Sequence, residues 1–221
     1  MDLVTGVLSG FGLSAAAGLN AYIPLFVVGL LIRFDQVQVT APYDILGQTP
    51  VLIVLGVLLF IETFVDKIPG LDHANDVLQT IVRPTAGALL FAGSMGHVTG
   101  QKPWIGFAFG LITAGGVHAT KATARVGITG ATFGTGGWIA SILEDVVSFF
   151  TTIFAVFIPI IGFIAAILIA VFGIRAYRKR KARKAEQKAA SPPSGEPMTL
   201  IATQEPSQEG SGPADPPPSS T

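Results

Sequence analysis

The sequence predicts an all-α membrane protein, a bundle of about six transmembrane helices with a disordered C-terminal tail. Half of the 221 residues are hydrophobic and only 13% are charged, and the mean hydropathy is +0.60. Soluble domains carry about 25% charged residues. Eight of the 14 Lys and Arg residues lie between Arg175 and Lys188, so the first 174 residues are nearly uncharged. This composition is typical of a polytopic membrane protein.

Six apolar segments are long enough to cross a hydrocarbon core of about 30 Å, which needs roughly 20 helical residues. The last two come from one apolar stretch, 138–174. One helix over that stretch would be roughly 55 Å long, too long for a single crossing. We divide it at Pro159, since proline suits the first turn of a helix. The expected spans are 4–32, 50–67, 78–98, 104–125, 138–156 and 158–176, and Pro84 is expected to break the third.

The chain divides into a transmembrane domain at 1–176, a basic juxtamembrane segment at 177–188 and a disordered tail at 189–221 that is rich in Pro, Ser and Gly. Basic residues next to a span stay cytoplasmic. Counting back through six spans predicts that both termini are cytoplasmic, in a multi-pass protein of the cell inner (plasma) membrane. The basic residues of 175–188 are also expected to attract anionic lipid headgroups.

An internal similarity predicts an inverted repeat of three helices plus three. Residues 11–23 align with 109–121 at an offset of 98, with six identities in 13 positions. The first and fourth spans cross in opposite directions, as in the inverted repeats of many secondary transporters. Asn20 and His118 occupy equivalent places near the middle of their spans. The repeat therefore indicates a site near these two residues.

Ionisable residues inside the apolar segments form the candidate site. His118, Lys121 and Arg125 follow each other at spacings of three and four, which places them on one face of a helix. A charge at the bilayer centre costs at least about 2.5–3.5 kcal/mol, so such residues normally face the bundle interior or a wet cavity. The residues expected to bind substrate are Asn20, Arg83, His118, Lys121 and Arg125.

Four acidic residues are expected to carry a proton or balance the charge: Glu62, Asp66, Glu144 and Asp145. The most economical arrangement pairs Glu144 or Asp145 with Lys121 or Arg125 across a helix interface. Two alternatives stay open, namely that the charges only lock helix packing, or that they reach the membrane interface as long side chains do.

The stretch 67–84 carries a polar stripe, in which residues recur at helical spacing: Asp72, Asp76, Gln79 and Arg83. The stripe predicts an amphipathic helix at the cytoplasmic surface that leads into the third span. A divalent cation held by Asp72, His73 and Asp76, or a re-entrant segment lining a cavity, are the alternatives. We predict no metal and no cofactor.

Several stretches resemble the family of membrane proteins catalogued as domain of unknown function 4126. They are "GLNAYIPLFVVGL", "FVDKIPGLDHANDVLQTIVRPTAGALL" and "HATKATAR" followed by "ASILEDV". The resemblance covers about residues 10–175 and implies a multi-spanning membrane protein, without a substrate or catalytic residues. The matching positions are Asn20, Tyr22, Pro24, Glu62, Asp66, Lys67, Pro69, Gly70, Asp72, Asp76, Arg83, Pro84, His118, Lys121, Arg125, Glu144 and Asp145.

The leading functional hypothesis is a transporter or flippase for a small anionic or phosphate-bearing substrate, coupled to protons. A non-transporting membrane scaffold is the alternative, and a membrane-embedded enzyme comes third. The chain has no cysteine, which excludes disulfides and thiolate sites. It has no phosphate loop, nucleophile elbow or metal-binding helix pair. We expect no nucleic-acid partner, and an enzyme is less favoured than a carrier.

Overall fold

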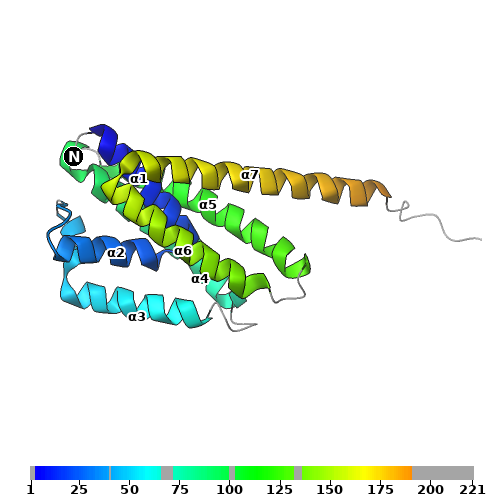
Figure 1. The fold of residues 1–221 in the computed structure, drawn as a ribbon, viewed down its shortest axis with the longest axis horizontal. Coiled ribbons are helices and arrows are strands. Elements are labelled where there is room, and N and C mark those ends of the chain that lie inside the picture. The colour runs from blue at the N-terminus through cyan, green and yellow to red at the C-terminus, as the bar shows by residue number, and fades with distance from the viewer. Residues whose placement is uncertain (1–2, 40, 66–71, 100–102, 132–135, 191–221) are drawn as a thin grey trace, which may run out of the picture. The chain divides into compact units, whose positions relative to one another are not determined.

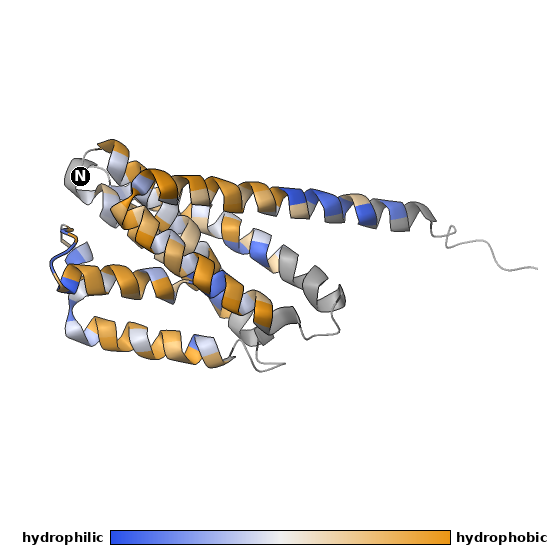
Figure 2. Ribbon diagram, viewed as in Figure 1, coloured by the Kyte–Doolittle hydropathy of each residue, from blue (hydrophilic) through white to orange (hydrophobic). Residues whose placement is uncertain are grey.

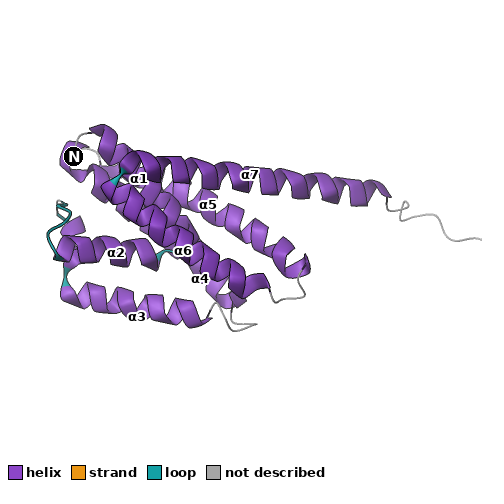
Figure 3. Cartoon of the chain, viewed as in Figure 1, coloured by secondary structure: helices purple, strands orange, loops and turns teal. Residues whose placement is uncertain are grey.

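The computed structural model describes residues 3–39, 41–65, 72–99, 103–131 and 136–190, and these ranges contain helices and no strand (Figures 1 and 3). The helices are α1 (Leu3–Leu19), α2 (Tyr22–Arg33), the 3₁₀ helix η1 (Tyr43–Gly47), α3 (Thr49–Val65), α4 (Asp72–Thr99), α5 (Pro103–Ala131), α6 (Gly136–Phe157) and α7 (Pro159–Ala190). One compact unit extends from Met1 to Ala182, and the rest of the chain forms a second unit.

The first expected span, 4–32, is wrong as a single helix, because α1 and α2 form a hairpin. Ser9 and Leu13 of α1 line one cavity together with Val28 and Ile32 of α2. In one straight helix, residues 9 and 32 would be roughly 35 Å apart. Figure 1 shows α2 running back from the end of α1. The polypeptide therefore turns at residues 20–21, and α2 returns toward the end at which α1 begins.

The local sequence explains this turn. The ring of a proline clashes with the carbonyl four residues earlier in a helix and supplies no N–H to it, and Pro24 places that conflict at Asn20. The backbone N–H of Asn20 closes α1 by donating to the Ala16 carbonyl at 3.0 Å. The Asn20 Oδ1 then accepts the N–H groups of Tyr22 and Ile23 at 3.0 and 3.1 Å. Asn20 thus caps the start of α2.

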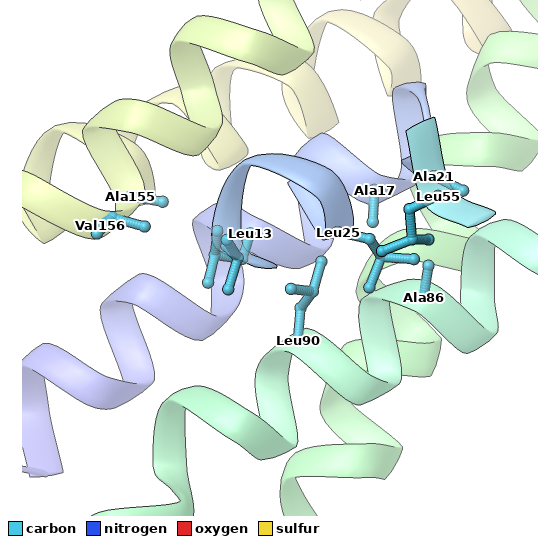
Figure 4. Packing of buried hydrophobic residues seen from close by; sticks show 10 residues of the cluster. Leu13, Ala17, Ala21, Leu25, Leu55, Ala86, Leu90, Ala155 and Val156 are labelled. Carbon is cyan, nitrogen blue, oxygen red and sulfur yellow. The ribbon is translucent and has the colours of Figure 1, made fainter. Parts of the chain in front are cut away.

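Small residues let α1 pass through the centre of the bundle. A Cβ atom added at Gly12 would overlap Ala155 of α6 and approach Gly162 of α7, and one at Gly18 would overlap Val117 of α5. Small residues at helix interfaces allow such close approach. Figure 4 shows the adjoining apolar core, which α1, α2, α3, α4 and α6 form. Its labelled members are Leu13, Ala17, Ala21, Leu25, Leu55, Ala86, Leu90, Ala155 and Val156.

The division at Pro159 is confirmed. Helix α6 ends at Phe157, Ile158 makes the turn and α7 begins at Pro159. A Cβ atom at Gly162 would overlap the backbone of Ala155, so the two helices touch next to the turn. Within the compact unit they then diverge (Figure 1). Helix α4 continues through Pro84, where we expected a break.

Two of the described segments, Ile139–Phe157 and Pro159–Arg183, are long and apolar enough to cross a membrane, and α1, α2 and α3 are shorter apolar helices. In Figure 2, α2, α3, α6 and the part of α7 next to α6 are coloured mostly as hydrophobic. The helix boundaries do not support the inverted repeat, because its two aligned segments, 11–23 and 109–121, differ in structure. The chain turns after Leu19, whereas α5 continues straight through His118.

Candidate functional site

Polar side chains from α3, α4, α5 and α6, together with Asn20 of the turn between α1 and α2, gather around the tip of the α1–α2 hairpin. We call this set the tip layer. Most of its members are no more than 7% exposed, although they lie among apolar helices. The described members are Asn20, Glu62, Gln79, Arg83, His118, Lys121, Glu144 and Asp145.

Arg83 of α4 is the centre of one half of the tip layer. Its Nη2 donates to Glu62 Oε1 of α3 at 3.1 Å, and the two side chains are 1% and 2% exposed. Its Nε donates to Gln79 Oε1, one turn earlier on α4, at 3.2 Å. A buried guanidinium is tolerated only when its charge and donors are satisfied in this way. Arg83 therefore joins α3 to α4 inside the bundle.

His118 of α5 extends this half of the layer. Arg83 Nη1 lies 3.5 Å from His118 Nδ1, and His118 Nε2 lies 3.2 Å from Thr80 Oγ1. A guanidinium can only donate, so Nδ1 is the acceptor in this contact, and the ring hydrogen is assigned to Nε2. Protonation of His118 would set two donors against each other. The contact between α4 and α5 is thus sensitive to a proton on this ring.

Lys121 of α5 is the centre of the other half. Its Nζ lies 2.7 Å from Glu144 Oε2 of α6 and donates to the carbonyl of Leu19 at 2.8 Å. The Lys121 side chain is 3% exposed, whereas that of Glu144 is 18% exposed. The ammonium also lies at the C-terminal end of α1, where helix carbonyls carry partial negative charge. The pairing of Lys121 with Glu144 that the sequence predicted is confirmed.

Asn20 ties the hairpin tip to α6. Its Nδ2 donates to Asp145 Oδ1 at 2.9 Å while its Oδ1 caps α2. Ser148, one turn along α6, donates to the Ala16 carbonyl of α1 at 3.0 Å. One end of α1 is therefore held by Lys121 and Ser148, and the adjoining start of α2 by Asn20.

The charged groups of the described tip layer have both signs. Two cations, Arg83 and Lys121, lie with three carboxylates, those of Glu62, Glu144 and Asp145. An anion that approaches Lys121 is repelled by Glu144 while that carboxylate is ionised.

A groove reaches the tip layer from the side. It has a volume of about 480 Å³ and lies between α6 and α7, with α1 and α5 as its floor. Lys121 and Glu144 are its charged residues. The remaining lining residues are nearly all apolar: Leu19, Val117, Thr120, Leu143, Val147, Leu168, Ile169, Phe172, Gly173 and Ala176.

The sequence model of the family described as Domain of unknown function (DUF4126) matches residues 7–179. The chain belongs to this family. The match includes the whole tip layer and stops within the basic segment that follows α7's apolar part. No curated protein and no solved structure matches the chain. The family description assigns no reaction or substrate. The function of this DUF4126 member is therefore inferred from the geometry of its tip layer.

The structure brings six of the predicted site residues of this DUF4126 chain together in the tip layer, namely Asn20, Glu62, Arg83, His118, Lys121 and Glu144, and Asp145 joins them through Asn20. The side chains of Arg125, Asp66, Asp72 and Asp76 lie outside the described part of the structure. Within the part that is described, no three His, Asp or Glu residues are placed to hold a metal ion.

Sequence reasoning missed three polar contacts of the DUF4126 tip layer. The sequence showed Gln79 only as one member of the polar stripe at 67–84. In the structure Gln79 is 1% exposed and accepts a hydrogen bond from Arg83. Thr80 and Ser148 contribute through their hydroxyl groups, toward His118 and the Ala16 carbonyl respectively. A serine or threonine in an apolar helix has no spacing signal that distinguishes such a contact from ordinary back-bonding to the helix.

A second cavity of this chain, about 40 Å³ in volume, lies between the hairpin limbs, away from the tip layer. Its lining is apolar apart from Ser9, Gln38, Tyr43 and Ser94. Burial raises the pKa of the Tyr43 hydroxyl, which stays neutral at physiological pH. The cavity has room for a water molecule but holds no charged group. It is less suited to an anion than the tip layer.

Proposed function

We propose that the chain is an integral membrane protein that carries an anionic or phosphate-bearing substrate together with a proton. The membrane location rests on the distribution of side chains. Large apolar residues on the helices face outward, among them Phe60 at 64%, Leu168 at 62% and Phe172 at 78% exposed, while Arg83 and Glu62 are buried. Soluble monomers rarely expose large apolar patches. Lipid is the solvent that fits this surface.

The hairpin changes the expected topology. The N-terminal end of α1 lies with η1 and the end of α6, since Ser9, Tyr43 and Val156 share one cavity. The basic residues follow the apolar part of α7 at the opposite end. The expectation that both termini are cytoplasmic required α1 and α2 to form one crossing. We place Leu3 on the outer side and the basic segment on the cytoplasmic side of the inner membrane.

This orientation buries the tip layer within the membrane. Phe157 follows Glu144 by 13 positions on α6, a distance of roughly 20 Å along the helix. The tip layer then lies in the cytoplasmic half of a core about 30 Å thick. Interrupted helices whose ends point into a buried polar site are the usual construction of secondary transporters. The ends of α1 and α2 meet the tip layer in this manner.

The Lys121–Glu144 pair is the single observation that carries the proposed function. The cation is buried and its partner carboxylate is partly exposed to the groove. Protonation of Glu144 would neutralise the carboxylate and leave the ammonium for the oxyanion of a substrate. Loss of the proton would restore the ion pair and expel the substrate. Anion and proton would therefore travel together.

The test uses the full chain in vesicles, with inorganic phosphate and a fluorescent phosphatidylglycerol as probes. We expect at least one probe to move 10-fold or more faster than in protein-free vesicles, and faster with an inward proton gradient than without one. Glu144→Gln imitates the protonated residue and should make the rate independent of the gradient. If neither probe moves with protein shown to be folded, the proposed function is wrong.

A scaffold is the second candidate, and one observation favours it. The buried cations Arg83 and Lys121 both contact carboxylates directly, and satisfied ion pairs can serve packing alone. If the protein is a scaffold, Glu144→Gln would change its stability, and neither the natural protein nor the variant would transport the probes. The dependence of carriage on a proton gradient separates the two functions.

A further inference from the structure

We infer that the groove between α6 and α7 binds an anionic phospholipid, with an acyl chain along the groove and its phosphate at Lys121. This inference rests on the proposed function and names its substrate class. It differs from carriage of a small soluble anion, which would need an aqueous path to the tip layer.

The groove is built as a side opening. Helices α6 and α7 touch at Ala155 and Gly162 beside their turn and diverge from there within the compact unit (Figure 1). Leu143 and Val147 of α6 form one wall, and Leu168 and Phe172 of α7 form the other. A volume of about 480 Å³ is within the range of ligand pockets, about 300–1,000 Å³. An acyl chain can enter from the bilayer without leaving an apolar environment.

The lining selects an amphiphile over a fully polar ion. A hydrated phosphate would lose its water against the leucine, valine and phenylalanine side chains that form most of the lining. A lipid buries only its apolar chain there, and its phosphate meets charge at the groove floor. Lys121 supplies that charge once Glu144 is protonated.

The open end of the groove also suits an anionic headgroup. Ala176 is the last lining residue on α7, and the exposed residues beside it are Arg175, Arg178 and Lys179. Basic residues at a membrane surface attract anionic lipids by about 1 kcal/mol each. They would concentrate such lipids at the entrance that leads to Lys121.

The experiment places the full chain in nanodiscs with a phosphatidylglycerol analogue that carries a photoreactive diazirine in its acyl chain. Mass spectrometry then locates the crosslinks. We expect labelling on 143–147 and 168–172, at least fivefold above that of a phosphatidylcholine analogue with the same chain. Leu168→Trp, which fills the groove, should reduce the labelling several-fold.

Ile160→Trp is the matched control, because Ile160 and Leu168 both lie on α7, are both 62% exposed, and only Leu168 lines the groove. Equal labelling by both lipids, or equal loss in both variants, would overturn the inference. If phosphate moves across vesicles but the groove is not labelled, the lipid inference fails and the proposed function stands. If the groove is labelled but neither transport probe moves, the lipid site stands and the proposed function fails.

Discussion

At the scale of single residues, the tip layer depends on each buried charge having its partner. Lys121 and Glu144 face each other at 2.7 Å with the cation almost fully buried. Removing one member of a buried ion pair leaves the other uncompensated, which costs about 3–5 kcal/mol. Lys121→Gln should therefore lower the thermal stability of the detergent-solubilised protein strongly.

The double variant Lys121→Gln with Glu144→Gln separates packing from function. Two amides can hydrogen-bond without a buried charge, so we expect most of the stability lost in Lys121→Gln to return. Transport should stay absent, because no cation remains for the substrate. Full transport in the double variant would show that the pair does not act in carriage.

Arg83 provides a second test at this scale. Its guanidinium reaches Glu62, Gln79 and His118 from one side chain, which the single ammonium of lysine cannot reproduce. We expect Arg83→Lys to lower the melting temperature clearly, although the charge is kept. A melting temperature equal to that of the natural protein would mean that charge alone, and not the fork of hydrogen bonds, stabilises this half of the layer.

At the scale of elements, the hairpin turn depends on Asn20. Asn20→Ala removes the cap of α2 and the donor to Asp145, at a cost of about 1–2 kcal/mol. Asn20→Asp keeps the cap but sets two carboxylates against each other. We expect this variant to be less stable at pH 8 than at pH 5, since protonating one carboxylate restores a donor. Thermal unfolding at both pH values measures the difference, and equal stability would contradict the Asn20–Asp145 contact.

The close passage of α4 and α5 depends on glycine, and two positions of α5 make a matched pair. A Cβ atom at Gly110 would overlap the backbone of Gly87 and Ala88, whereas one at Gly116 would meet nothing within 4 Å. Gly110→Ala should cost about 1–3 kcal/mol through overpacking. Gly116→Ala should be neutral or stabilising, by up to about 1 kcal/mol of helix propensity. Unfolding of both variants in detergent checks the contrast.

Sequence reasoning recovered the parts of these elements that leave a local signal. Pro159 marked the α6–α7 division, and the Lys121–Glu144 pair followed from the rule that buried charges need partners. The hairpin was missed, because the apolar residues on both sides of Asn20 read as one long span. Pro24 carried the signal, since its ring conflicts with a helical carbonyl at Asn20. Pro84 gives a similar local signal, yet α4 continues through it.

At the scale of the whole molecule, the fold class follows from composition, but the number of crossings does not. Hydropathy cannot distinguish one crossing of 29 residues from two limbs that fold back, because both are apolar throughout. The contacts that decide between them, such as the cavity shared by Ser9 and Ile32, join residues far apart in sequence. The path of the chain through the membrane is therefore the central claim, because it determines where the tip layer lies.

Side-specific labelling of single cysteines tests this path most directly, since the natural chain has no cysteine to remove. The variants are Val4→Cys, Gln36→Cys and Lys179→Cys, at exposed positions in the first turn of α1, after α2 and on α7. A membrane-impermeant maleimide applied to intact cells should label Val4→Cys and Gln36→Cys and leave Lys179→Cys unlabelled until the cells are opened. Protection of Val4→Cys together with Lys179→Cys, while Gln36→Cys is labelled, would contradict the hairpin and restore a single first crossing.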